Sequence, residues 1–157
     1  MRAFLCLLLL PFAVGAQTVK SDEHSFRVVK LVERLDHPWC VAFLPDGRML
    51  VTERDGRLNL LSKNFERTNV EGVPPVFAEG QGGLFDVALH PDFAKNGIVY
   101  LSYAGPGSGG ASTELLRAKL NGNRLEDAKV IFRQEPKTRG GVHFGGRIVF
   151  DRAGFLY

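Results

Sequence analysis

The chain has 157 residues, two cysteines and a formal net charge of +3, and 45% of its residues are hydrophobic. This length is usual for one domain and is enough to bury a core. The basic residues are dispersed, which excludes a nucleic-acid-binding patch, and two cysteines cannot build a disulfide framework.

Segment 1–16 has the layout of a secretory signal peptide. Arg2 gives a short positive start, 3–14 is an apolar run, and small residues end at Ala16. The run is shorter than the roughly 17–25 residues that a spanning helix needs, which disfavours a membrane anchor. We therefore expect cleavage after Ala16, a periplasmic or secreted product, and no membrane span in the mature chain 17–157.

A unit of two short apolar strands joined by an Asp-containing turn recurs along the mature chain. The turns of its three copies contain Asp46, Asp92 and Asp151. Glycine supplies the positive φ that tight turns need, and β-branched and aromatic residues suit a pleated, packed surface. A period of roughly 40–50 residues with short strands is typical of propeller blades, with loops accommodating the longer second interval.

These units predict an all-β chain. Strands are expected near residues 39–43, 48–53, 57–61, 84–89, 98–103, 113–120 and 146–150. In the strand at 113–120, Leu116, Ala118 and Leu120 share one side. Segment 26–31 is expected to be a lone N-terminal strand of the kind that closes many propellers by pairing with the last blade.

Two other architectures are weaker. A β-sandwich also uses short strands, but it does not require the repeated unit. Segment 105–110 matches the dinucleotide-binding motif G-x-G-x-x-G, precedes a stretch at 112–120 that is compatible with a helix, and has Glu126 downstream. Pro106 and the small residues around it suit a surface loop equally well, and no further βα unit follows. We therefore expect no long helix over 112–120.

Three groups of motifs resemble, in order, those of the soluble quinoprotein glucose/sorbosone dehydrogenases. They are Pro38-Trp39 with Phe43 to Gly47, Thr52-Glu53-Arg54 and Gly56-Arg57; Gly80 to Leu84 with His90 to Phe93; and His143 to Arg147 with Phe150. The similarity runs from about Leu35 to Tyr157 and is greatest to the aldose sugar dehydrogenases. Glucose dehydrogenases commonly carry an acidic residue before the histidine, where this chain has Val142, which argues against a preference for glucose.

The resemblance implies a six-bladed β-propeller, of which this chain covers about the first three blades. It also implies oxidation of aldose sugars at the anomeric carbon to lactones, dependent on pyrroloquinoline quinone, with an external electron acceptor. The quinone and a calcium ion would be clamped mainly by residues of later blades. Six blades need roughly 350 residues. We therefore expect 17–157 to be the N-terminal part of a longer protein, inactive by itself.

His143 is the expected general base. An alcohol gives up hydride readily only as its hydroxyl proton leaves, and a neutral imidazole is a suitable acceptor for that proton. Gly140-Gly141 and Gly145-Gly146 leave the backbone uncrowded around it. The resemblance assigns the matching histidine this role, with hydride passing to a quinone carbon. The alternative is a histidine that caps a strand beside a glycine turn.

Gln81 is the expected cofactor-binding residue, because its amide both donates and accepts hydrogen bonds and suits a quinone carbonyl or a sugar hydroxyl. The resemblance places a glutamine there. Gln81 and His143 should share one face of the channel, with the turns at Asp46, Asp92 and Asp151 at the opposite end. No spacing resembles a zinc site or an EF-hand, so no metal ligand is predicted in this chain.

The remaining polar candidates are expected to be structural. His37 and His90 should bond nearby backbone, and the three turn aspartates should bond their own downstream amides. Glu53 and Arg54 are expected to pair between blades. Cys40 lies in an apolar stretch and is predicted to be a buried structural thiol.

Two other functions compete with sugar oxidation. A lactonase of the gluconolactonase type needs a central divalent-metal site of Glu, Asn and Asp, and no matching constellation is present. The alternative that stays open is an exported, non-catalytic propeller that binds a carbohydrate or protein partner, because a fold can persist after its chemistry is lost.

Overall fold

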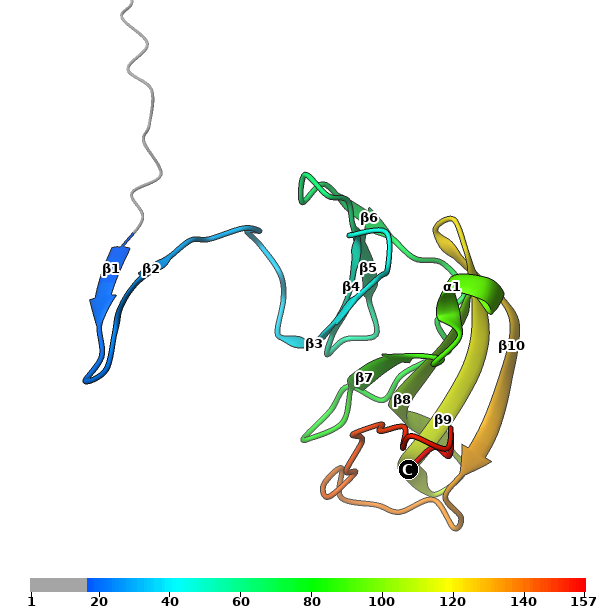
Figure 1. The fold of residues 1–157 in the computed structure, drawn as a ribbon. Coiled ribbons are helices and arrows are strands. Elements are labelled where there is room, and N and C mark those ends of the chain that lie inside the picture. Colours follow the sequence, from blue (N-terminus) through cyan, green and yellow to red (C-terminus); the bar gives the residue numbers. More distant parts are fainter. Residues whose placement is uncertain (1–16) are drawn as a thin grey trace, which may run out of the picture. The chain divides into compact units, whose positions relative to one another are not determined.

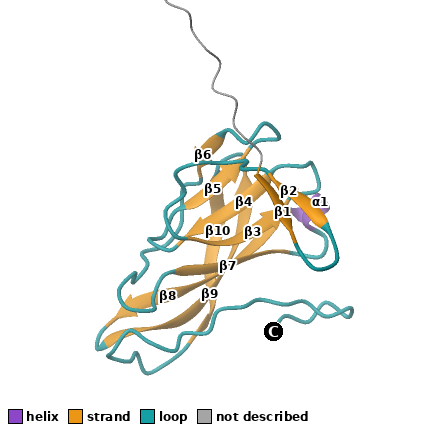
Figure 2. Ribbon diagram, turned by 90° about the vertical axis from the view of Figure 1, so that its left-hand side faces the viewer, coloured by secondary structure: helices purple, strands orange, loops and turns teal. Residues whose placement is uncertain are grey.

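A computed structural model describes residues 17–157, and the predicted signal peptide at 1–16 lies outside the described residues. The described chain forms two compact units, one ending at Glu33 and the other comprising Arg34–Tyr157. All but one of the elements in these units are β-strands (Figures 1 and 2).

The first unit is a β-hairpin. Strand β1 (Gln17–Lys20) pairs antiparallel with β2 (Ser25–Val28). The turn between them is closed by the Ser21 hydroxyl, which donates to the carbonyl of His24 over 2.9 Å. The prediction of a lone strand over 26–31 is therefore wrong: the strand ends at Val28 and has a local partner.

The second unit contains two four-stranded antiparallel sheets. The strands of the first sheet follow the chain in the order β3 (Pro38–Phe43), β4 (Met49–Glu53), β5 (Leu58–Leu61) and β6 (Arg67–Asn69). The second sheet has the same topology, with β7 (Leu84–Leu89), a short helix α1 (Phe93–Asn96), then β8 (Ile98–Gly107), β9 (Gly110–Asn121) and β10 (Arg124–Arg133). Figure 2 shows the strands in orange and the helix in purple.

Six of the predicted strands are confirmed, as β3, β4, β5, β7, β8 and β9. The predicted strand at 146–150 is wrong, since only Phe150 forms a bridge, to Leu156. Val149 also exchanges backbone hydrogen bonds with Tyr157, so the pairing that is present joins 149–150 to 156–157. The backbone N–H of Ile148 instead donates to the carboxylate of Asp86 over 2.9 Å.

The dinucleotide-binding alternative is excluded by the pairing of β8 with β9. The two strands are antiparallel from Ile98 opposite Lys119 to Gly107 opposite Gly110, so segment 112–120 is a strand. In this hairpin, Gly105 allows the side chain of Glu114 to pack against the backbone, because a Cβ at Gly105 would lie 2.3 Å from the carboxyl carbon of Glu114.

The hydrophobic core lies between the two sheets, where β3 and β4 pack against β7. Its most buried members are Leu50, Leu58, Leu84, Val99 and Leu101. Leu116 and Ala118 of β9 join them, as the alternation in the sequence predicted. Burial of each such leucine contributes about 1.5–3 kcal/mol, so this packing is what holds the two sheets together.

A buried threonine hydroxyl bridges the two sheets. Thr52 of β4 accepts a hydrogen bond from the N–H of Cys40 in its own sheet, over 3.0 Å. The same hydroxyl donates to the carbonyl of Phe85 in β7, over 2.7 Å. One side chain thus fixes the first strand of the next sheet against the second strand of the preceding one.

Ser102 repeats this arrangement one sheet further along the chain. Its hydroxyl accepts from the N–H of Asp86, over 3.0 Å, and donates to the carbonyl of Gly146. Ser102 lies in β8 as Thr52 lies in β4. In both cases the hydroxyl accepts from the first strand of its own sheet and donates to the part of the chain that follows that sheet. The segment that begins at Gly146 is therefore attached to the second sheet as the second sheet is attached to the first.

Candidate functional site

Two loops meet where Gln81 and His143 lie. The carbonyl oxygen Oε1 of Gln81 accepts the backbone N–H of His143 over 2.9 Å. The backbone N–H of Gln81 donates to the carbonyl of Gly141 over 2.7 Å. Both side chains are exposed. The predicted proximity of these two residues is therefore confirmed, although they are far apart in the sequence.

The loops touch backbone to backbone. A Cβ at Gly80 would lie only 2.5 Å from the carbonyl oxygen of Gly141, so this contact requires glycine. Beyond the contact the space is open: among the described residues, no atom lies within 4 Å of a Cβ built at Gly140 or Gly145. The expectation of an uncrowded backbone beside His143 holds for these two glycines and is wrong for Gly141 and Gly146, where a Cβ would meet Phe77 and Phe85.

His143 has a left-handed backbone conformation, with φ at 61°. Such a conformation costs about 1–3 kcal/mol for a residue other than glycine and persists only where the surroundings enforce it. Here the bond from its N–H to Gln81 and the anchoring of the neighbouring Phe144 hold the backbone. His143 is exposed, and the space next to the nearby Gly140 and Gly145 is open.

A row of aromatic rings packs against the loop that carries His143. The ring of Phe144 lies 6.3 Å from that of Phe77 and 5.9 Å from that of Phe85, centroid to centroid. Trp39 of β3 continues the row at 5.4 Å from Phe85. Gly146 packs on the same ring, since a Cβ there would lie 2.9 Å from the Phe85 side chain. Phe144, which follows His143, thus packs on Phe85 of β7, and Phe85 packs in turn on Trp39 of β3.

Arg54 braces the Gln81 loop, a role that the sequence analysis missed. Its guanidinium donates at 2.5–3.1 Å to three loop carbonyls, those of Ala78, Gly80 and Gly82. The predicted pairing of Glu53 and Arg54 between blades is wrong. Glu53 is fully buried and pairs with Arg57 of the same sheet over 2.6 Å. The planar fork of Arg54 suits several carbonyls at once, which a lysine ammonium would not match.

Asp86 holds the chain just after the His143 loop. Its buried carboxylate accepts the N–H of Ile148 over 2.9 Å and the guanidinium of Arg147 over 3.1 Å. Its other oxygen accepts the N–H of Val87 over 3.0 Å. The residue is near Gln81 in the sequence, but its contacts are those of an anchor.

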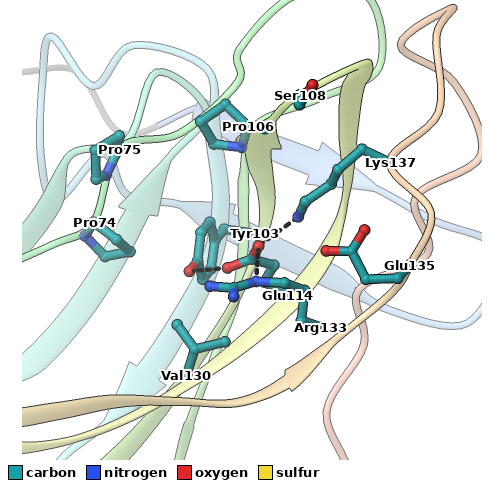
Figure 3. A pocket seen from close by; sticks show the side chains of 11 residues that line it. Pro74, Pro75, Tyr103, Pro106, Ser108, Glu114, Val130, Arg133, Glu135 and Lys137 are labelled. Carbon is teal, nitrogen blue, oxygen red and sulfur yellow. Dashed lines mark hydrogen bonds and ion pairs between the residues drawn. The ribbon is translucent and has the colours of Figure 1, made fainter.

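The carboxylate of Glu114 in β9 is also buried, and it bonds Lys137 near the start of the segment that leads to His143 (Figure 3). Its oxygens accept hydrogen bonds from the Tyr103 hydroxyl at 2.6 Å, from Arg133 at 2.7 Å and from Lys137. The group borders a cavity of about 540 Å³ that Pro74 also lines. Burial raises the pKa of Glu114, but the bonds from Arg133, Lys137 and Tyr103 outweigh it and lower the pKa to about 2.

The acid stability of the protein should depend on Glu114. Because its folded pKa of about 2 lies below its ordinary value of 4.5, the ionised group stabilises the fold above pH 4.5. That stabilisation, on the order of 3 kcal/mol, is lost as the pH falls toward 2. We expect the free energy of unfolding to fall less steeply over this pH range in Glu114→Gln than in the wild type, measured by urea titration. Parallel curves would contradict the assignment.

The two other histidines with predicted roles differ. His90 confirms its prediction, because its Nδ1 accepts the N–H of Asp92 over 3.0 Å. His37 does not: its Nδ1 lies 2.5 Å from the carboxylate of Asp36, a side-chain partner. The sequence could not separate the two cases, since both histidines precede a proline.

The turn aspartates also differ. Asp46 and Asp151 accept hydrogen bonds from amides two residues downstream, as predicted, at 3.0 and 2.9 Å. Asp92 does not, because α1 begins directly after it and its carboxylate pairs with Lys95 at 3.2 Å. Asp46 and Phe93 of α1 line one cavity, at the ends of β3 and β7 away from Gln81. This agrees with the predicted separation of the turns from the loops.

Cys40 is half-buried, and burial raises the pKa of its thiol, which agrees with a structural role. Among residues 17–157, no three His, Cys, Asp or Glu side chains come together as a metal site would need. In the same part of the chain, no helix is long and apolar enough to cross a membrane.

Comparison with known proteins identifies the family. The family described as Glucose / Sorbosone dehydrogenase matches residues 35–157. The chain belongs to this family. The resemblance found in the sequence motifs is thereby confirmed over the same part of the chain.

Relatives within the glucose/sorbosone dehydrogenase family are similar over most of this chain. The aldose sugar dehydrogenase of Escherichia coli is 41% identical over 155 residues, which are 95% of this chain and 42% of that protein. A crystal structure of a glucose dehydrogenase has a TM-score of 0.78 and 49% identity over 82% of this chain and 38% of its own. The quinone-bound aldose sugar dehydrogenase of Streptomyces coelicolor has a TM-score of 0.68 and 31% identity, over 82% and 39%. The chain therefore spans about two fifths of the length of these relatives.

Proposed function

We propose that the full-length protein oxidises aldose sugars at the anomeric carbon to lactones, with pyrroloquinoline quinone as cofactor and His143 as general base. The observation that carries the proposal is the hydrogen bond between Gln81 and His143. It joins the two residues that sequence motifs had singled out, beside open space at Gly140 and Gly145. Membership of the family and the named activities of its relatives support the same reaction.

We further propose that the two sheets are the first two blades of a six-bladed propeller and that 146–157 begins the third. The repeated hydroxyl bridge, from Thr52 and then from Ser102, supports equivalent joints between successive blades. Coverage of 42% of the Escherichia coli relative agrees with an N-terminal portion of that architecture. The same proposal includes a signal peptide at 1–16, a periplasmic or secreted protein, and an external electron acceptor.

The residues of the site fit a flat, polar cofactor together with a sugar. His143 is exposed, and a side chain built at Gly140 or Gly145 would meet no other part of the described chain within 4 Å of its Cβ, which is compatible with a ligand approaching there. When bound, the quinone would supply the hydride acceptor. We propose that calcium and most contacts to the cofactor are provided by later blades.

His143 would take the proton of the anomeric hydroxyl, since a neutral imidazole nitrogen accepts a proton and makes departure of hydride from the same carbon favourable. Gln81 would hold the base and bind ligand at once. Its Oε1 accepts the N–H of His143, so its Nε2 is the atom that would donate to a quinone carbonyl or a sugar hydroxyl.

The proposal is tested on the full-length protein reconstituted with pyrroloquinoline quinone and calcium. We expect it to bind the quinone and to oxidise aldoses, followed by reduction of an artificial electron acceptor. A protein that binds no quinone would overturn the enzymatic function. The non-catalytic propeller that binds a carbohydrate or protein partner would then be the better account.

Replacing Gln81 by alanine should weaken binding more than it slows turnover. We expect kcat to fall by less than about tenfold, because Gln81 orients groups and transfers no proton, and the KM for sugar or the Kd for quinone to rise more. Gln81→Glu is the matched control: it keeps an oxygen for the His143 N–H and loses the Nε2 donor. If Gln81→Glu restores affinity to the wild-type value, the Nε2 assignment is wrong.

A further inference from the structure

The segment that carries His143 has no strand or helix of its own in the described structure, from Gln134 to Val149. Its conformation is therefore fixed by bonds to the sheet beside it. Thr138 exchanges backbone hydrogen bonds with Ala111 at the start of β9. Thr113 of the same strand donates to the carbonyl of Phe144. Strand β9 is thus the surface on which the segment is mounted.

The strongest of these attachments is ionic. Lys137 lies in the irregular segment, yet its side chain is only 5% exposed, and its ammonium bonds the equally buried carboxylate of Glu114. A lysine is almost never buried to this degree unless it is paired. The aliphatic part passes Gly107, where a Cβ would lie 3.1 Å from the lysine chain. Figure 3 shows Lys137 and Arg133 converging on the same carboxylate.

We propose that the Glu114–Lys137 pair is a positioning link that fixes the beginning of the His143 segment on β9, so that the imidazole is held in one place. The expected effect of this link on turnover rests on the proposed function, whereas its expected effect on the conformation of the segment does not. Displacement of a catalytic group by about 1 Å can cost 10²-fold in rate, so a buried ion pair is an effective support. Asp86 anchors the other end of the segment through Ile148.

Arg133 provides a matched comparison within the same cluster. It bonds the same carboxylate over 2.7 Å, but its side chain is 53% exposed and it belongs to β10, where it pairs with Glu114 in the ladder. The ladder already fixes Arg133, so its ion pair adds no constraint on the segment. The two cations thus bond the same carboxylate but differ in burial and in whether they lie on the segment that carries His143.

The test compares Lys137→Met with Arg133→Met in the full-length protein. Each variant leaves Glu114 with one cation and the Tyr103 hydroxyl, so each should fold. In Lys137→Met we expect hydrogen exchange of the backbone amides of Thr138 and His143, which are hydrogen-bonded to Ala111 and Gln81, to accelerate at least tenfold. We also expect kcat for aldose oxidation to fall at least tenfold, with KM changed less than threefold. In Arg133→Met the exchange rates of these amides and kcat should both stay within twofold of the wild type.

Lys137→Arg should recover most of the protection and turnover, because the cavity that Lys137 lines leaves room for a longer cation. Equal effects of Lys137→Met and Arg133→Met would show that the cluster only stabilises the fold, and would overturn the proposal. Unchanged exchange at the amides of Thr138 and His143 in Lys137→Met would overturn it as well. If the wild type oxidises no sugar, the proposed reaction fails, and the exchange measurement still decides the positioning role.

Discussion

His143→Ala is expected to lower the turnover of the reconstituted full-length protein by roughly 10²–10⁴-fold, the usual contribution of a positioned acid–base group. Without the imidazole, nothing at this position takes the hydroxyl proton as hydride leaves the sugar. Quinone and calcium binding should stay nearly unchanged, since most of their contacts are proposed to lie in later blades. The measurement is steady-state aldose oxidation with an artificial electron acceptor.

The backbone at His143 calls for a second variant. Its φ of 61° is strained for alanine, so loss of activity in His143→Ala combines a missing base with a displaced loop. Asparagine tolerates this conformation well and cannot act as the base. We expect His143→Asn to lose turnover to a similar extent. Near-wild-type turnover in His143→Asn would mean that the base is another residue.

Asp86→Ala is expected to lower the free energy of unfolding by about 3 kcal/mol. The side chain accepts the N–H groups of Val87 and Ile148, which are 3% and 8% exposed, and its removal leaves both without an acceptor. Each buried donor left unpaired costs about 1–3 kcal/mol. Urea unfolding of the full-length protein measures the change.

Two controls separate this effect from loss of a charge. Asp86→Asn keeps an oxygen that can accept from Ile148, so it should cost less than half as much. Asp46→Ala removes an exposed turn aspartate that accepts the N–H of Arg48, and is expected to cost about 1 kcal/mol or less. A loss in Asp86→Ala no larger than that in Asp46→Ala would show that the carboxylate does not hold the segment.

The predicted strands that form are those whose sequence shows packing on both sides or a clear alternation, such as β9. In the two four-stranded sheets, the missed strands are β6, whose residues are all exposed, and β10, which is mostly exposed and interrupted by irregular register. Neither leaves a hydrophobic period to detect, because each is stabilised by pairing with an inner strand. The predicted strand at 146–150 has its apolar residues, but only 149–150 pair, with 156–157, and the N–H of Ile148 bonds Asp86.

The two site residues were predicted from motifs, and their contact followed from their places in successive repeats. The residues that hold them were missed. Arg54 was noticed within a motif but was assigned an ion pair, and Glu114 with Lys137 carried no signal at all. Their partners lie more than twenty residues away. Such pairings depend on the three-dimensional path of the chain, and a single sequence contains no local trace of it.

The hydroxyl bridge has a consequence for how such a repeat can diversify. In both copies the receiving group is a main-chain carbonyl, which every amino acid possesses, and the two receiving residues are Phe85 and Gly146. These are among the most different side chains available, yet the joint is the same. The hydrogen bond across the seam therefore places no demand on the identity of the residue that receives it. That identity is set by packing instead, because Phe85 is 1% exposed and a Cβ at Gly146 would lie 2.9 Å from the Phe85 side chain.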